Sequence, residues 1–323
     1  MGRPKLILTR RWPRAVEAHL QASFDVALNE SDRPLTAAQL QDALRHYDAV
    51  LPTVTDLINA DVLGVEPLRA RLLANFGVGF NHIDLDAAKA RGVTVTNTPD
   101  VLTDCTADLA MALLLAVARR VGEGERLVRS GLWRGWSPTQ LLGAKITGKT
   151  LGLIGFGRIA QAMARKAHFG FGMPVIFHTP RPPGAEFCRS LGASPRESIE
   201  AVLREADFVS LHCPGGPANR HLVNAARLAL MKPGAFLINT ARGDVVDNEA
   251  LVHALQNQAI AGAGLDVFEG EPNLHPGFLE LENAVLLPHL GSATWETREA
   301  MGLRVAENVA AFFAGHTPPD KLA

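Results

Sequence analysis

Short runs of apolar residues alternate with longer amphipathic segments along nearly the whole chain. The runs are continuously apolar, which is typical of parallel strands buried on both faces, whereas the longer segments have helical periodicity. We therefore predict an α/β protein whose parallel sheets are covered by helices. The expected strands in the first part of the chain are residues 6–9, 24–28, 49–51, 72–76 and 93–97, with helices at 13–21 and 36–44. The expected strands in the second part are residues 150–154, 175–177, 208–212, 235–239, 261–267 and 284–287.

Two points in this pattern mark domain boundaries. Asn97-Thr98-Pro99-Asp100 ends a strand before a long helix that begins near Thr103. Pro288-His289-Leu290-Gly291 ends the last strand before a final helix at about residues 294–314. A length of 323 residues suggests two domains. We predict a discontinuous substrate-binding domain of residues 1–99 and 291–323, and a dinucleotide-binding domain of residues 100–290.

A glycine-rich turn follows the strand at residues 150–154. The run Gly155-Phe156-Gly157-Arg158-Ile159-Ala160 fits the pattern GxGxxA and leads into a helix that reaches about Ala167. The first glycine permits a sharp turn, the second lets pyrophosphate approach the backbone, and the small alanine allows close packing of helix and strand. A glycine pattern alone could be only a tight turn. The strand before it, the helix after it and the next strand at 175–177 together favour a dinucleotide site.

The next strand ends in His178-Thr179-Pro180-Arg181. Sites that prefer NAD usually place an acidic residue here, about 20 residues beyond the glycine motif, to bind the ribose hydroxyls. No acid is present in this run, and His178, Thr179 and Arg181 could accept a 2′-phosphate. We therefore expect NADP(H) to be preferred, with NAD(H) possible. The alternative is that Arg181 is only a solvated loop cation.

Three ionisable residues follow apolar runs in the second half of the chain. Arg242 lies in Asn-Thr-Ala-Arg-Gly, Glu271 in Phe-Glu-Gly-Glu-Pro, and His289 in Pro-His-Leu-Gly. The carboxyl ends of parallel strands share one edge of a sheet, so a cation, a carboxylate and an imidazole are expected together. That set can bind an anionic substrate and transfer a proton. Taken singly, each has another interpretation: an ion-pair partner for Arg242, a turn residue for Glu271 and a helix cap for His289.

Composition narrows the function further. The formal net charge is -1 and no basic stripe is present, which argues against a nucleic-acid partner. The three cysteines are far apart and form no CxxC pair, so we expect neither a metal site nor disulfides. The longest apolar stretch, residues 109–118, is too short to span a membrane, and the N-terminal apolar run is too short for a signal peptide. We expect a cytoplasmic protein.

These motifs resemble the D-isomer-specific 2-hydroxyacid dehydrogenase family along nearly the whole chain. Residues 74–84, Ala-Asn-Phe-Gly-Val-Gly-Phe-Asn-His-Ile-Asp, are similar to the family's substrate loop, and residues 98–108 and Trp133-Arg134-Gly135-Trp136 resemble its glyoxylate and hydroxypyruvate reductase branch. The family often has glycine where this chain has Ala160. The resemblance implies two Rossmann- or flavodoxin-like domains with the active site in the cleft between them, and a homodimer. Trp133 and Trp136 are expected as interface or core aromatics.

The resemblance and the chemistry imply the same residue roles. His289 is expected as general acid/base, Glu271 as the partner of its other ring nitrogen, and Arg242 as the bidentate ligand of the substrate carboxylate. Backbone N–H groups of Val78 and Gly79 are expected to bind the same carboxylate, and Asp266 to lie near the nicotinamide or influence protonation. The implied cofactor-binding positions are Thr106, Gly155, Phe156, Gly157, Arg158, Ile159, His178, Thr179, Arg181, Cys213, Pro214, Thr240, Ala241, Asp266, His289 and Gly291.

The expected activity is NADP(H)-dependent reduction of small 2-oxo acids, with glyoxylate and hydroxypyruvate as leading substrates, to D-2-hydroxy acids. One alternative is a non-catalytic dinucleotide sensor that resembles the corepressors related to this family. The other is a dehydrogenase for a different 2-oxo acid, such as 3-phosphohydroxypyruvate.

Overall fold

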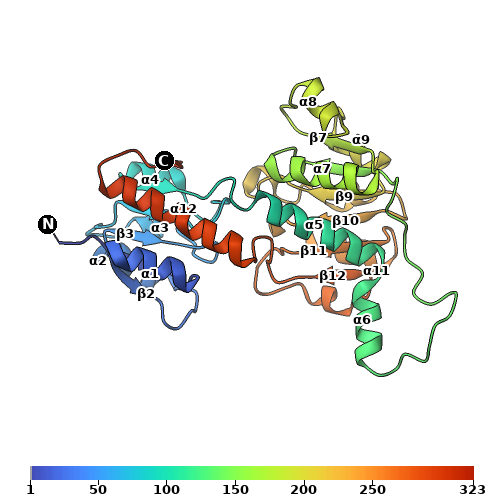
Figure 1. The fold of residues 1–323 in the computed structure, drawn as a ribbon, viewed down its shortest axis with the longest axis horizontal. Coiled ribbons are helices and arrows are strands. Elements are labelled where there is room, and N and C mark those ends of the chain that lie inside the picture. Colours follow the sequence, from blue (N-terminus) through green and yellow to red (C-terminus); the bar gives the residue numbers. More distant parts are fainter. Residues whose placement is uncertain (1) are drawn as a thin grey trace. The chain divides into compact units, whose positions relative to one another are not determined.

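The computed structural model describes residues 2–323, and the chain divides into two compact units (Figure 1). Unit 1 combines the chain up to Leu102 with Ser292–Ala323, and unit 2 is Thr103–Gly291. Every pair of neighbouring strands described in the two sheets is parallel. The predicted α/β class with parallel sheets is therefore confirmed.

Unit 1 contains a five-stranded sheet in the order β2-β1-β3-β4-β5, which is the flavodoxin-like order. Its strands are β1 (Lys5–Leu8), β2 (Asp25–Leu28), β3 (Ala49–Leu51), β4 (Leu72–Ala74) and β5 (Thr94–Thr96). Its helices are α1 (Arg14–Ser23), α2 (Ala37–His46), α3 (Ala60–Leu63), α4 (Leu85–Ala90) and α12 (Trp295–Phe313). The C-terminal helix α12 packs closely on α1, because a Cβ at Gly302 would lie 2.5 Å from a methyl carbon of Val16.

Unit 2 contains a seven-stranded sheet in the order β12-β11-β10-β9-β6-β7-β8. Its strands are β6 (Leu151–Ile154), β7 (Val175–His178), β8 (Ala193–Pro195), β9 (Phe208–Leu211), β10 (Phe236–Asn239), β11 (Gly262–Leu265) and β12 (Ala284–Leu286). Its helices are α5 (Thr103–Ala118), α6 (Val121–Arg129), α7 (Arg158–Phe171), α8 (Ala185–Ser190), α9 (Ile199–Glu205), α10 (Ala225–Leu228) and α11 (Asn248–Gln256), with 3-10 turns η1 (Pro217–Asn219), η2 (Gly243–Val245) and η3 (Pro276–Glu280). The strand order reverses between β6 and β9, and in such sheets ligands bind outside the carboxyl ends of the strands at that point.

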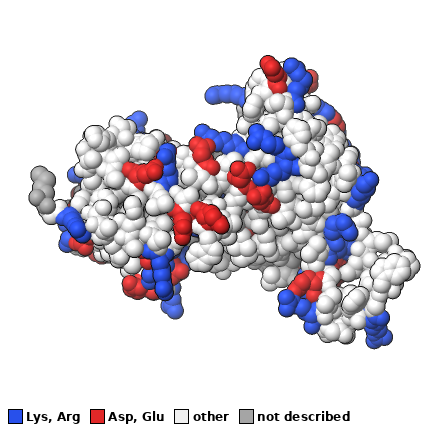
Figure 2. Space-filling view, viewed as in Figure 1, with Lys and Arg blue, Asp and Glu red and all other residues white. Residues whose placement is uncertain are grey.

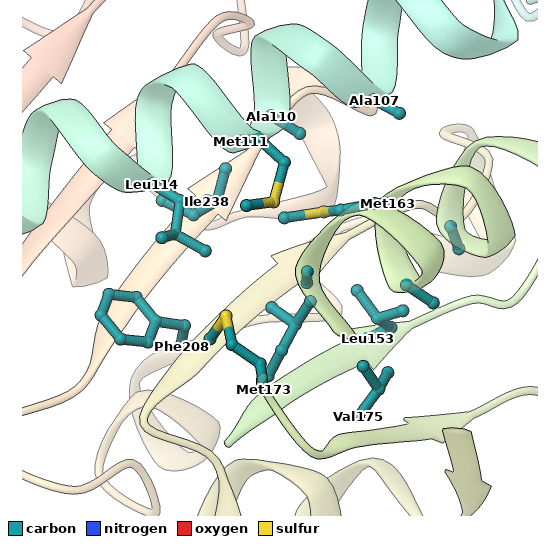
Figure 3. Close-up of a cluster of buried hydrophobic side chains, with 14 of the residues drawn as sticks. Ala107, Ala110, Met111, Leu114, Leu153, Met163, Met173, Val175, Phe208 and Ile238 are labelled. Atoms are coloured by element: carbon teal, nitrogen blue, oxygen red, sulfur yellow. The ribbon is translucent and has the colours of Figure 1, made fainter. Parts of the chain in front are cut away.

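One face of the unit 2 sheet is covered by α5 and α7, which lie side by side (Figure 1). Met111 of α5 and Met163 of α7 point toward one another above the sheet residues Leu153 and Ile238 (Figure 3). Each of the four side chains is at least 94% buried, with exposed fractions of 0 to 6%. Burial of a large apolar side chain contributes about 1.5–3 kcal/mol, so this layer holds β6 and α7, and hence the turn between them, in place.

Most predicted elements are present, with ends that differ by one or two residues. The expected strand 72–76 ends earlier, at Ala74, because Asn75 and Phe76 begin a loop. Strand β8 was not predicted, since it has three residues, ends in proline and shows no periodic pattern. The helix α6 and the segment after it extend away from the unit 2 sheet (Figure 1). Trp133 and Trp136 lie in that segment and are 51% and 82% exposed, so the prediction that they could be core residues of the folded chain is wrong.

Within residues 2–323 no helix combines the length and the apolar character needed to cross a membrane. On the face shown in Figure 2, basic and acidic side chains are intermixed.

Candidate active site

The glycine turn after β6 has the backbone geometry that a dinucleotide site requires. Gly155 has a φ of +87°, and a Cβ at this position would lie 2.7 Å from the carbonyl oxygen of His212. Only glycine therefore fits between β6 and the segment that follows β9. A Cβ at Gly157 would meet nothing within 4 Å, so this side of the turn is open. Ala160 is fully buried, as predicted from its small size.

The N-terminus of α7 is available to an anion. Gly157 is its N-cap and supplies no side-chain cap, while the first N–H groups of a helix have no partners within it. A helix of 14 residues also carries partial positive charge at this end. The backbone of Arg158 and Ile159 thus fits a pyrophosphate beside Gly157, with Phe156 buried behind the turn.

The end of β7 presents polar side chains without an acid. His178 is partly buried, and its Nδ1 lies 3.1 Å from the carbonyl oxygen of Arg196. Arg196 itself is paired with Glu205 at 2.8 Å. Thr179 is partly exposed and Arg181 is exposed, and within residues 2–323 no carboxylate pairs with Arg181. Arg181 is therefore the cation of this loop that remains available to a phosphate.

Residues after β9 and β10 line the same carboxyl edge of the sheet. Cys213 and Pro214 follow β9, and burial raises the pKa of the Cys213 thiol to about 11, so it is an unreactive thiol at neutral pH. Thr240 and Ala241 follow β10. The Thr240 hydroxyl is buried, and no hydrogen-bond partner is found for it in the described part of the chain. An orphaned buried hydroxyl at this edge of the sheet is what a polar group of a bound cofactor would satisfy.

His289 and Glu271 form a hydrogen-bonded pair. The Nδ1 atom of His289 lies 2.8 Å from Oε2 of Glu271, and Oε1 of Glu271 accepts the N–H of Phe268 at 2.8 Å. Burial acts to raise the pKa of Glu271, but the hydrogen bond and charge of His289, the Phe268 N–H and the charge of Arg242 outweigh it and leave the pKa lowered. An ionised Glu271 accepts from Nδ1–H, which leaves Nε2 of His289 to exchange a proton.

Asp266 holds the backbone on either side of His289. Its carboxylate accepts the N–H of Leu290 at 2.6 Å and of Gly291 at 2.8 Å, and its carbonyl oxygen accepts the N–H of His289 at 2.9 Å. The Thr106 hydroxyl donates to the carbonyl oxygen of Gly291 at 2.8 Å. His289 has a φ of +57°, a left-handed conformation that is unfavourable for residues other than glycine. These bonds hold His289 in that conformation.

The main role of Asp266 in this structure is therefore to hold the backbone next to His289, which its position in the sequence did not predict. Burial raises the pKa of its carboxyl, and the two N–H donors act against that shift.

Arg242 follows β10 on a segment packed against the loop that carries Glu271. A Cβ at Gly243 would lie 1.9 Å from the backbone carbon of Phe268, so these two segments touch. The side-chain amide of Asn239 donates to the carbonyl oxygen of Arg242 at 2.9 Å. Desolvation lowers the pKa of Arg242, although Glu271 and Asp244 act in the opposite direction. The structure thus brings the predicted cation, carboxylate and imidazole to one edge of the unit 2 sheet.

Val78 and Gly79 lie in unit 1, on the loop that follows β4. Asp84, expected to start the next helix, caps α4 by accepting the N–H of Ala87. Asn75 and Asn97 were not singled out from the sequence as functional. Both side chains are buried at this loop. Their polar side chains, in or next to the apparent substrate loop, were the sequence signal that could have identified them.

Comparison with known proteins identifies the family. Residues 111–291 match the model described as D-isomer specific 2-hydroxyacid dehydrogenase, NAD binding domain. A glyoxylate reductase from Thermococcus litoralis is 45% identical, over 98% of this chain and 96% of its own length. A glycerate dehydrogenase from Hyphomicrobium methylovorum is 39% identical, over 98% of both chains.

Solved structures agree with these sequence matches. The crystal structure of an NADPH-dependent glyoxylate/hydroxypyruvate reductase from Sinorhizobium meliloti, in complex with NADP and malonate, superposes with a TM-score of 0.88 and 35% identity, covering 100% of this chain and 97% of that one. The predicted resemblance is confirmed, and residues 111–291 form a nicotinamide-dinucleotide-binding domain. The chain belongs to the D-isomer-specific 2-hydroxyacid dehydrogenase family.

Proposed function

We propose that this protein is an NADP(H)-preferring reductase that converts small 2-oxo acids, glyoxylate and hydroxypyruvate foremost, to D-2-hydroxy acids. The observation that carries the proposal is the His289–Glu271 pair, which lies on the same sheet edge as Arg242 and the glycine turn. A bound nicotinamide dinucleotide would supply the hydride. The chain supplies the proton, the charge that orients the substrate and the fixed geometry.

His289 is the proposed general acid/base. Its Nε2–H donates a proton to the substrate carbonyl oxygen during reduction and takes it back during oxidation. Glu271 accepts from Nδ1–H, which fixes the ring orientation and offsets the positive charge of the protonated ring, as a carboxylate does for a triad histidine. The lowered pKa of Glu271 keeps this carboxylate ionised at neutral pH.

Arg242 is the proposed ligand of the substrate carboxylate. A guanidinium offers a planar, bidentate pair of N–H donors that matches a carboxylate. We propose that the backbone N–H groups of Val78 and Gly79 bind the same carboxylate. Small monocarboxylates are favoured because no cluster of basic side chains accompanies the 74–84 loop. Relatives named glyoxylate reductase and glycerate dehydrogenase support this substrate class.

The cofactor preference rests on the end of β7. Thr179 offers a hydroxyl donor and Arg181 a positive charge to a 2′-phosphate, and His178 lies at the same end of the strand. The absence of an acid in residues 178–181 removes the group that selects NAD. The NADP bound in the Sinorhizobium meliloti relative supports this preference.

The test is NADPH and NADH oxidation with glyoxylate, hydroxypyruvate, pyruvate, phenylpyruvate and 3-phosphohydroxypyruvate, followed by absorbance. The proposal requires a higher kcat/KM for glyoxylate or hydroxypyruvate than for the other acids. It also requires a higher kcat/KM for NADPH than for NADH. A preference for the phosphorylated acid would assign a different family dehydrogenase. Tight NADPH binding without turnover of any 2-oxo acid would favour the dinucleotide sensor.

We also propose that the protein is a homodimer joined through the segment after α6. Exposed apolar side chains gather there and in the last turn of α6: Val128, Leu132, Trp133, Trp136 and Leu142 are 51% to 82% exposed. Exposed apolar side chains on a projecting segment favour binding to another protein chain. Because members of this family form homodimers, we expect that partner to be a second copy of this chain. Sedimentation of the wild type and of Trp136→Ser tests this: a dimer that the variant weakens supports it, and a monomeric wild type at micromolar concentration contradicts it.

A further inference from the structure

Two buried asparagines hold the backbone carbonyl groups of the loop after β4. The side-chain amide of Asn75 donates to the carbonyl oxygens of Gly77 and Gly79, both at 3.0 Å. The side-chain amide of Asn97 donates to the carbonyl oxygen of Val78 at 2.9 Å. Asn75 is fully buried and Asn97 is 7% exposed. Three successive carbonyl groups are thus bound from inside unit 1.

This arrangement fixes the direction of the next three N–H groups. The cis peptides of residues 2–323 are Glu66–Pro67 and Glu271–Pro272, so the peptides of the loop are trans. In a trans peptide the C=O and the N–H point in opposite directions. Because the carbonyls of Gly77 and Gly79 point toward Asn75, the N–H groups of Val78 and Phe80 point away from Asn75. Because the carbonyl of Val78 points toward Asn97, the N–H group of Gly79 points away from Asn97. Each of these N–H groups is thus held in a fixed direction, away from the asparagine that binds its own peptide, where it can donate to an anion.

His82 fixes which way the Asn75 amide faces. Its Nε2 lies 3.0 Å from Oδ1 of Asn75, and His82 is 8% exposed. Since Asn75 Oδ1 can only accept, Nε2 must carry the proton in this contact. That leaves the NH2 group of Asn75 toward the two glycine carbonyls. A reversed amide would place its oxygen against both carbonyl oxygens and a donor against Nε2–H.

We propose that Asn75, Asn97 and His82 form a carbonyl clamp that positions the N–H groups of the loop for the substrate carboxylate. This inference rests on the proposed function and adds positioning residues to it. The clamp residues act through the backbone and do not themselves touch the substrate. Their contribution is preorganisation, because a flipped peptide would present a carbonyl oxygen to the anion in place of an N–H.

The decisive variant is Asn75→Asp, which keeps the shape and removes both donors. A carboxylate facing the carbonyls of Gly77 and Gly79 repels them and favours flipped peptides. The matched control is Asn29→Asp in the same unit. The Asn29 amide also donates to two backbone carbonyls, those of Thr9 and Arg33, both at 2.7 Å, and its Oδ1 accepts from Ser31 at 2.7 Å. The control thus loses the same type of contact at a site away from the loop.

Two measurements separate positioning from general damage. We expect Asn75→Asp to raise the KM for glyoxylate and the Kd for oxamate, an unreactive carboxylate probe, by about tenfold to a hundredfold, as loss of hydrogen bonds to a charged group does. The Kd for NADPH and the kcat should change far less, and Asn29→Asp should leave all four near wild type. Equal oxamate affinity in Asn75→Asp and wild type would overturn the clamp.

A second pair of variants holds if Asn75→Asp does not fold. His82→Gln retains an N–H donor and should preserve the oxamate Kd, whereas His82→Leu removes it and should weaken binding. Equal oxamate affinity in these two variants would also overturn the clamp. Failure of the proposed function gives a different result: no turnover of any 2-oxo acid, with oxamate binding still sensitive to Asn75→Asp. If the wild type reduces glyoxylate without binding oxamate, the proposed function stands and the KM for glyoxylate decides on the clamp: an unchanged KM in Asn75→Asp overturns it.

Discussion

The backbone around His289 gives a prediction whose size can be worked from the structure. Asp266→Asn keeps the shape of a side chain that is 1% exposed but replaces one carboxylate oxygen by an NH2 group. In the wild type, the Asp266 carboxylate accepts the N–H groups of Leu290 and Gly291 at 2.6 and 2.8 Å. Asparagine can accept one of them, and its NH2 group must then face the other.

The magnitude follows from two opposed terms. Two hydrogen bonds to a charged acceptor contribute about 3–6 kcal/mol, at about 1.5–3 kcal/mol each. The left-handed conformation of His289 costs about 1–2 kcal/mol, so the native loop is favoured by about 1–5 kcal/mol. One neutral hydrogen bond contributes only about 0.5–1.5 kcal/mol, which roughly cancels the strain. The population with His289 correctly placed should therefore fall to half or less.

We expect kcat for glyoxylate reduction by Asp266→Asn to fall about two- to tenfold, because a 1.4 kcal/mol difference is a factor of ten in population. The control is Asp207→Asn at the amino edge of the same sheet, where the carboxylate accepts the N–H of Thr150 at 2.9 Å. Both variants should lose thermal stability, but only Asp266→Asn should lose kcat. Unchanged kcat in Asp266→Asn would refute the proposed role of these bonds.

Three further changes test the other parts of the site. Arg242→Lys should raise the KM for glyoxylate by about tenfold or more, because an ammonium cannot reproduce the bidentate contact; steady-state kinetics would contradict this if KM stayed at the wild-type value. Arg181→Ala should lower kcat/KM for NADPH while leaving that for NADH nearly unchanged, and an equal loss with both cofactors would exclude the 2′-phosphate contact. The pKa of Glu271 is lower in the folded protein than its ordinary value of 4.5, so the folded state binds the carboxyl proton less tightly than the unfolded chain does. The ionised carboxylate therefore stabilises the fold at pH values above 4.5. This contribution is lost as the pH falls through the pKa of the folded state. Glu271→Gln should therefore lower Tm more at pH 7 than below pH 4.5, and a Tm difference independent of pH would contradict the assignment.

The fold was predictable because its signals are local. Continuous apolar runs predicted parallel buried strands, and the spacing of Gly155, Gly157 and Ala160 predicted the turn into α7. The convergence of Arg242, Glu271 and His289 followed from one rule, that the carboxyl ends of parallel strands share an edge. The end of β4 was predicted two residues too late because Phe76 suggested that the apolar run continued past Asn75, whereas the backbone enters a loop there.

The supporting contacts were not predictable, because they depend on how segments far apart in sequence meet. Asp266 binds N–H groups 24 and 25 residues further on. Nothing in the sequence around Asn75 shows that its amide faces two glycine carbonyls, since that depends on the loop curling back and on His82 fixing the amide. Likewise, the left-handed conformation of His289 could not be predicted from the sequence, because the residue at this position is not glycine.

The central claim is that Nε2 of His289 transfers the proton while Glu271 holds the ring, and His289→Asn tests it most directly. A positioned general acid contributes about 10²–10⁴-fold, so kcat for glyoxylate reduction should fall by that factor while the Kd for NADPH, measured by fluorescence, stays near wild type. A His289→Asn protein that folds, binds NADPH and keeps near-normal kcat would contradict the account.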